Sequence, residues 1–317
     1  MSKIEIRKKI DISYKEDGVH LPAAVINTTE EAANYVRQFF HDDICLYESC
    51  FVLFLDKYNN TIAYHKASHG SRYLHLLDLQ LMTKLAINLS AKQIVLVHNH
   101  PTFFSGPNAS DGDVELTKEL KQNLDAVDII LRDHLVLKKD SYYSFYNQRG
   151  SFLRENSLNE KRLRRIKAKE LQPRVELCKE IKWRIVSRDD NFPMVNIRKA
   201  EDVISFIRKN FKKEIEKIEL YFILCLDENK KLISYQILNK NLNPGLYCDS
   251  LKVARNVIET LSSIFYVVHS YPFEGEAKCT EVDGDFFYNL ELRVELMDYV
   301  ITDYIILTKD NSFSYDG

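Results

Sequence analysis

The stretch IVLVHNHP, residues 94–101, is an apolar run that ends in two histidines one residue apart and then stops at a proline. Side chains two positions apart on a strand point to the same face, so His98 and His100 are expected to converge while Asn99 points away. Convergent neutral imidazoles at a strand end are a geometry in which proteins bind metal ions. An H-x-H pair alone is more often framework than ligand, so the interpretation needs further donors.

A third donor follows the histidines. In NASDGDVELTKEL, Asp113 falls in the first turn of the predicted next helix and faces back toward the strand end. Two histidines and one aspartate would leave the fourth position of a tetrahedral Zn²⁺ ion open for water, which is typical of catalytic zinc. Ser110 and Asp113 also fit a plain helix-capping box, an alternative that explains them without a metal.

A hydrolytic site also needs a proton acceptor and a group that stabilises the developing oxyanion. Glu48 begins the predicted strand ESCFVLFLD and could reach an activated water from a neighbouring strand. The alternative for Glu48 is an ordinary polar strand terminus. The Ser110 hydroxyl lies on the loop between the ligands and could serve the oxyanion. Residue types and order therefore permit a metallohydrolase.

The order of these residues matches the motif of the JAMM (MPN+, JAB) metalloproteases: Glu48, then H-N-H-P with His98 and His100, then Ser110 and Asp113. The segments FVLFLD, VLVHNHP, DVELTKEL and RDHLVL with YYSF resemble the bacterial RadC-like branch of that family, over about residues 30–146. The resemblance implies a zinc-dependent hydrolase that cleaves a peptide or isopeptide bond in a peptide or protein substrate. It also implies a cytidine-deaminase-like αβα fold, with Glu48 as base and Ser110 as oxyanion partner. The zinc ligands that it implies are His98, His100 and Asp113.

The chain departs from the family in two places. The loop TFFSGPNA replaces a shorter segment, so we expect an altered substrate rim in which Phe103 and Phe104 form an apolar subsite. The helix-hairpin-helix region that precedes the domain in its namesakes is not found before residue 30, which weakens the inference of DNA binding. His134 matches a family position and is expected either to orient a ligand or to be a framework histidine.

The chain repeats this pattern. ESCFVLFLD has a counterpart in ELYFILCLD, and positions 48 and 219, like 98 and 269, are 171 residues apart. Within each copy, apolar strands alternate with amphipathic helices. We therefore expect an α/β protein of two tandem αβα layered JAB/MPN domains with mixed sheets. The expected boundaries are 1–146 for the domain with the intact motif, 147–174 for a charged linker, and 175–317 for the degenerate copy.

The second copy has lost part of the motif. Glu219, His269 and Asp285 align with the base, the first histidine and the aspartate of the first copy, but Tyr271 and Val282 replace the second histidine and the serine. Neutral tyrosine is a poor zinc ligand, so metal affinity should fall steeply and no catalysis is expected there. By the same logic, Tyr271→His should improve metal binding in this copy.

Composition sets outer limits on function. The formal net charge is −2, so no global field recruits nucleic acid or an anionic membrane, although a local nucleic-acid contact stays open. No signal segment and no membrane-spanning run is found, which predicts a cytoplasmic protein with no membrane partner. The six scattered cysteines predict free thiols. The basic run EKRLRRIKAKE is expected to be a solvated helical connector, or else a contact for an acidic partner. The oligomeric state is not indicated.

Two other functions compete with the hydrolase. One is a non-enzymatic binding or scaffold protein, for example in DNA repair, that keeps a metal for structure alone. Retention of Glu48 and Ser110 favours the enzyme, since a structural site needs neither. The other is a zinc nucleoside or base deaminase, which the absence of an H-x-E and P-C-x-x-C pair disfavours.

Overall fold

A computed structural model describes residues 3–6, 8–40, 42–69, 77–101, 109–148, 152–154, 173, 175–187, 193, 195–239, 249–260, 262 and 264–315. The chain forms two compact units, Ile12–Trp183 and Met1–Asp11 with Arg184–Gly317. These limits differ from the domain boundaries predicted from the sequence, which end the first domain at residue 146 and begin the second at residue 175. The reason is strand pairing, because β1 belongs to the sheet of the second copy and β9 pairs with β5 of the first.

The sheet of the first copy is mixed. Its strands follow one another across the sheet in the order β9 (Leu177–Ser187), β5 (Thr61–His69), β4 (Ser49–Leu55), β6 (Gln93–Asn99), β7 (Ile130–Leu137) and β8 (Tyr142–Ser144). The sheet continues past β9 to β2 (Lys8–Tyr14), and β3 (His20–Pro22) also pairs with β9. β4 runs antiparallel to both β5 and β6, whereas β6 and β7 are parallel. A parallel pair needs a crossover, and α3 provides it.

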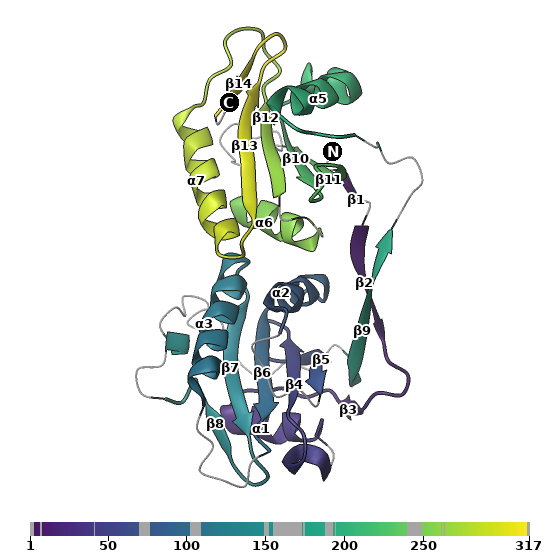
Figure 1. Cartoon of the computed structure of the whole chain (residues 1–317), viewed down its shortest axis with the longest axis vertical. Coiled ribbons are helices and arrows are strands. Elements are labelled where there is room, and N and C mark those ends of the chain that lie inside the picture. The colour runs from purple at the N-terminus through teal and green to yellow at the C-terminus, as the bar shows by residue number, and fades with distance from the viewer. Residues whose placement is uncertain are drawn as a thin grey trace. The chain divides into compact units, whose positions relative to one another are not determined.

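Helices cover both faces of this sheet. β4 and β6 are buried along their whole length, as strands between two helical layers must be. α1 (Thr29–Arg37) packs on the face that carries Phe51, Leu53, Val95 and Val97. On the other face, α2 (Leu79–Asn88) packs against α3 (Asp111–Ala126), which runs along β7 (Figure 1). Short 3₁₀ helices span Asp42–Cys45 and Phe152–Arg154.

The second copy repeats this topology. Its strands are ordered β1 (Lys3–Ile6), β11 (Leu232–Asn239), β10 (Leu220–Leu226), β12 (Ile264–Ser270), β13 (Val300–Leu307) and β14 (Ser312–Ser314). Its helices are α5 (Ala200–Ile215), α6 (Ser250–Glu259) and α7 (Glu281–Glu295), with α7 along β13 (Figure 1). The predicted fold class, α/β with two tandem αβα domains and mixed sheets, is confirmed. Among the described residues, no helix combines the length and apolar character needed to cross a membrane.

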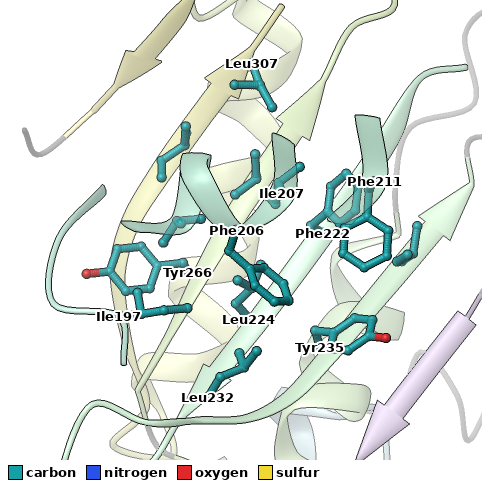
Figure 2. Close-up of a cluster of buried hydrophobic side chains, with 14 of the residues drawn as sticks. Ile197, Phe206, Ile207, Phe211, Phe222, Leu224, Leu232, Tyr235, Tyr266 and Leu307 are labelled. Carbon is teal, nitrogen blue, oxygen red and sulfur yellow. The ribbon is translucent and has the colours of Figure 1, made fainter. Parts of the chain in front are cut away.

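An aromatic-rich core lies under α5. Figure 2 shows Phe206, Ile207 and Phe211 of α5 over Phe222 and Leu224 of β10. The rings of Phe211 and Phe222 are 5.3 Å apart between centroids. Side chains one position away along β10 face α6 and α7 instead, so alternation along the strand divides the core into two layers.

Asp133 of β7 ties three segments of the first copy together. Its carboxylate accepts hydrogen bonds from Ser144 Oγ at 2.6 Å, from the Tyr146 amide at 3.0 Å and from Thr29 Oγ1 at 3.1 Å. Burial raises the pKa of Asp133 to about 6, although these hydrogen bonds act in the opposite direction. The Asp133 carboxylate therefore binds a proton more tightly in the folded protein than in the unfolded chain, where the pKa of an aspartate is about 3.9.

This difference predicts a pH dependence of stability. The contribution of Asp133 to the free energy of unfolding should fall by about 3 kcal/mol as pH rises from about 4 to about 6, and stay level above that. Urea unfolding gives the free energies of unfolding of wild type and Asp133→Asn at a series of pH values. The difference between these two free energies should change over this pH range. Asp140→Asn, at an exposed position, is the control and should track the wild type. A constant difference between wild type and Asp133→Asn over this range would contradict the prediction.

Candidate metal centre

The end of β6 and the start of α3 bring the predicted ligands together. Residues 94, 96 and 98 of β6 face α2 and α3, so the alternation carries His98 and then His100 to that face. β4 pairs with β6 so that Cys50 lies opposite His98, which places Glu48, just before β4, beside the end of β6. His98 and Asp113 are buried, while His100 and Glu48 are partly exposed. The site thus has a buried floor and an open side.

The distances between donor atoms suit a single small metal ion. His98 Nε2 lies 3.1 Å from His100 Nε2 and 3.2 Å from Asp113 Oδ1. His100 Nε2 lies 3.5 Å from Asp113 Oδ2. A tetrahedral zinc ion with ligands at about 2.0–2.2 Å requires donor separations of about 3.3–3.6 Å. The two distances from His98 are slightly shorter than this range. The three side chains offer donor types that zinc binds, and one atom from each lies within 4.8 Å of the others.

Asp113 is held by the cap of its own helix. The Ser110 amide and hydroxyl both donate to Asp113 Oδ2, at 2.8 Å each, and Ser110 Oγ accepts from the Asp113 amide at 3.2 Å. This is a capping box with aspartate at its third position. The capping and ligand interpretations of Ser110 and Asp113 are thus compatible, because Oδ2 serves the cap and Oδ1 faces His98.

Behind His98, a chain of hydrogen bonds leads back to the same helix. His98 Nδ1 lies 2.8 Å from His134 Nε2, and His134 Nδ1 lies 2.6 Å from Thr117 Oγ1. The Thr117 hydroxyl donates to the backbone carbonyl of Asp113. The ring of His134 also stacks on Phe145, with centroids 4.9 Å apart and planes 5° from parallel. All members of this chain are buried.

On the opposite face of β6, Asn99 holds the segment that carries Glu48. Its side-chain amide donates to the carbonyls of Ile44 and Tyr47, at 2.6 and 2.7 Å. Its Oδ1 accepts from the amide of Ser49 at 2.7 Å. Both amide hydrogens are used, so the orientation of this fully buried side chain is fixed. One tripeptide therefore presents two candidate ligands on one face and anchors the candidate base from the other.

The pKa shifts of Asp113 and His100 favour the forms that bind metal. Burial would raise the pKa of Asp113, but hydrogen bonds and charge from His98, with those from Ser110, hold it well below its usual range. Burial and the charge of His98 lower the pKa of His100, against the effect of Asp113. Burial, chiefly, lowers the pKa of His134 well below its ordinary value. An ionised carboxylate and neutral imidazoles are the forms that coordinate metals.

Glu48 has the electrostatics of a proton acceptor. Burial raises its pKa, His98 opposes the rise and Asp113 adds to it. A carboxylate with a raised pKa is a stronger base near neutral pH than an ordinary glutamate.

In the second copy, the equivalent histidine is bonded differently. His269 Nδ1 lies 2.6 Å from Asp283 Oδ1, and His269 Nε2 lies 2.6 Å from Glu219 Oε1. Tyr271 and Tyr304 both donate to Asp283, at 3.1 and 3.2 Å. Each ring nitrogen of His269 thus faces a carboxylate, which gives a closed hydrogen-bonded cluster.

Two sequence alignments for this copy were wrong. Asp285 is exposed and Val282 lies within α7, whereas Thr280 caps α7 and Asp283 occupies the place of Asp113. The Thr280 hydroxyl donates to Asp283 Oδ2 at 2.7 Å, as the serine does in the first copy. The shared tripeptide D-G-D caused the error, since it recurs two residues out of register with the helix start.

Sequence reasoning also missed the roles of Asn99 and Thr117. Asn99 was expected only to point away from the ligands, and its position between them is the one local signal for its clamp. Thr117 follows Asp113 by four residues on a helix, so the spacing predicts a shared face but not the histidine behind it. Phe103 and Phe104, the predicted apolar subsite, lie outside the described residues, as does the basic run of the linker.

Comparison with known proteins identifies the family of this chain. The model of the RadC-like JAB domain family matches residues 26–151 and 197–317, which together are more than half of the chain. A UPF0758 protein of Flavobacterium johnsoniae is 34% identical over 103 residues, covering 32% of this chain and 44% of that protein. One from Coprothermobacter proteolyticus is 31% identical over 128 residues, covering 40% and 54%. One from Legionella pneumophila is 27% identical over 137 residues, covering 43% and 59%. The chain thus spans about half the length of these relatives.

The two helix caps predict a contrast between the copies. Ser110→Ala and Thr280→Ala should each lower the free energy of unfolding by about 1 kcal/mol, because each removes an N-cap hydroxyl. Only Ser110→Ala should also weaken zinc binding, by about tenfold, because Asp113 loses a hydrogen bond that fixes its carboxylate. Urea unfolding and competition with a coloured zinc chelator measure the two effects. Equal zinc affinity in both variants would contradict the assignment of Asp113 as a ligand held by its cap.

Proposed function

Because the chain belongs to the RadC-like JAB domain family, we propose that its first copy is a zinc-dependent hydrolase that cleaves a peptide or isopeptide bond. The observation that carries the proposal is the convergence of His98, His100 and Asp113, whose donor atoms lie 3.1–3.5 Å apart. The partly exposed Glu48 beside this cluster is what a hydrolase needs and a structural metal site does not.

Each side chain has a definite task in this proposal. His98 and His100 present Nε2 atoms, and Asp113 presents Oδ1, to the ion. A zinc ion held there would act as a Lewis acid and activate a water molecule at its open coordination position. Three protein ligands leave such a position, whereas a structural site closes it with a fourth.

Glu48 is the proton carrier. Its raised pKa suits it to accept a proton from the attacking water and to return that proton to the leaving amine. The clamp from Asn99 fixes the backbone on both sides of Glu48, so the carboxylate starts from a defined place. Proton transfer depends on such positioning to within a hydrogen bond.

Ser110 serves the ligand first and the substrate second. Its hydroxyl hydrogen goes to Asp113 in this structure. Rotation of that hydrogen toward the scissile carbonyl would stabilise the developing oxyanion, while the Ser110 amide keeps its bond to Asp113. The substrate is a peptide or protein, and its sequence is set by loops rather than by this cluster.

The second copy takes no part in the chemistry. The hydrogen bonds of His269 to Glu219 and Asp283 occupy the nitrogen atoms and the carboxylates that a metal ion would need. Tyr271 supplies a hydroxyl where the first copy has an imidazole. We therefore assign hydrolysis to the first copy alone.

Exchange of the base tests the proposal. Glu48→Gln should keep its zinc and lose hydrolysis by about 10²–10⁴-fold, because the amide cannot accept the proton. The matched control, Glu219→Gln at the equivalent position of the second copy, should retain wild-type activity. The probe is a mixture of quenched fluorescent peptides, including isopeptide-linked ones, with zinc-loaded protein.

Equal activity in Glu48→Gln would remove this residue from the mechanism. If zinc-loaded wild type cleaves none of the probes, the alternative function, a non-enzymatic binding protein, would be favoured.

A further inference from the structure

The two copies differ in what stands behind the first histidine. In the first copy, Thr117 and His134 connect the back of His98 to α3. Phe287 and Tyr304 occupy the equivalent places of the second copy, each 170 residues further along. The Phe287 side chain has no hydrogen-bonding group, and Tyr304 donates its hydroxyl hydrogen to Asp283. The second copy is thus a natural variant of the first that lacks this connection.

The hydrogen atoms available in the hydrogen-bond series behind His98 determine which group donates in each bond. The carbonyl of Asp113 can only accept, so the single hydroxyl hydrogen of Thr117 goes there. Thr117 Oγ1 must then accept from His134, which puts the hydrogen of neutral His134 on Nδ1. His134 Nε2 is left with a lone pair and accepts from His98 Nδ1. A neutral His98 therefore keeps its free lone pair on Nε2, which faces the other ligands.

We propose that Thr117 and His134 form a hydrogen-bond relay that fixes His98 in the form with hydrogen on Nδ1 and Nε2 free for metal, so that both are positioning residues for metal binding. The relay runs from one candidate ligand to another, because it starts at His98 and Thr117 binds the backbone of Asp113. It therefore sets the first histidine and the aspartate relative to each other. The inference rests on the metal site of the proposed function.

The second copy shows the arrangement that His269 adopts without the relay. Its Nδ1, the atom that faces the relay in His98, instead faces Asp283 at 2.6 Å. Its ring lies flat on Tyr221, with centroids 3.9 Å apart and planes 14° from parallel. In the second copy, the relay is missing and His269 Nε2 is bonded to Glu219, so the two differences from the first copy occur together.

The test replaces the threonine hydroxyl by a methyl group. Thr117→Val keeps the shape of a buried side chain but removes both the acceptor for His134 and the bond to the carbonyl four residues earlier. Thr83 of α2 is a matched control, because it is equally buried and its hydroxyl donates to the Leu79 carbonyl at 3.0 Å. Thr83→Val therefore removes the same kind of helix bond without touching a histidine, and Thr117→Ser restores the hydroxyl.

Zinc affinity, measured by competition with a coloured chelator, is the first readout. Thr117→Val should bind zinc about 10–100-fold more weakly than wild type, as loss of a partner behind a metal ligand does elsewhere. Thr83→Val should stay within about threefold, and Thr117→Ser should approach wild type. Equal affinity in Thr117→Val and Thr83→Val would overturn the proposal.

The second readout needs neither a variant that folds nor bound metal. Long-range ¹H–¹⁵N spectra of metal-free wild type, labelled at histidine nitrogens, report which nitrogen carries hydrogen. The relay requires hydrogen on His134 Nδ1 and on His98 Nδ1, with His134 Nε2 bare. Hydrogen on His134 Nε2 would overturn the relay even if zinc binds. Failure of wild type to bind zinc would instead contradict the proposed function, while the spectra still decide the relay.

Discussion

His98, Asn99 and His100 end a strand whose backbone sends successive side chains to opposite faces of the sheet, and the site is built on that alternation. Two imidazoles reach the face covered by α2 and α3, where the N-terminus of α3 supplies a carboxylate. The asparagine between them reaches the other face and binds the segment that carries Glu48. A shift of register by one residue would exchange the faces and separate every one of these groups. Burial of β6 on both sides prevents such a shift.

Duplication has preserved the framework and changed the chemistry. Both copies keep the strand order, the crossover helix and a capping box whose carboxylate points at a histidine. In the first copy, that carboxylate meets two imidazoles. In the second, it meets one imidazole and two tyrosine hydroxyls, and Glu219 closes the other side. Hydrogen bonds within the protein thus fill the place that corresponds to the candidate metal site of the first copy.

Local patterns allowed most of the first copy to be predicted from its sequence. Continuous apolar strands, amphipathic helices and the capping signal at Ser110 locate the elements around the site. The H-x-H spacing fixes the face of the ligands. The supporting contacts could not be predicted in this way, because they join residues far apart in the chain. His98 and His134 are 36 positions apart, and Asn99 and Ile44 are 55 positions apart. The exchange of β1 and β9 between the sheets also depends on long-range pairing that no local pattern encodes.

The second copy shows where pattern matching fails in physical terms. The histidine and the helix are separated by one residue less than in the first copy, so the repeated D-G-D is not equivalent in space. The helix cap decides the register, since Thr280 accepts a hydrogen bond from the first-turn amide of Asp283, whereas the aligned residue Val282 has no polar side chain. A search for a capping box, rather than for matching letters, would have found the pair.

Metal content per chain is the measurement that tests the account most directly. Elemental analysis of protein purified without added metal should find one zinc ion per chain in wild type and none in His100→Ala. The matched variant Tyr271→Ala, at the equivalent position of the second copy, should keep the ion. Zinc that persists in His100→Ala, or that disappears in Tyr271→Ala, would contradict the assignment of the metal site to the end of β6.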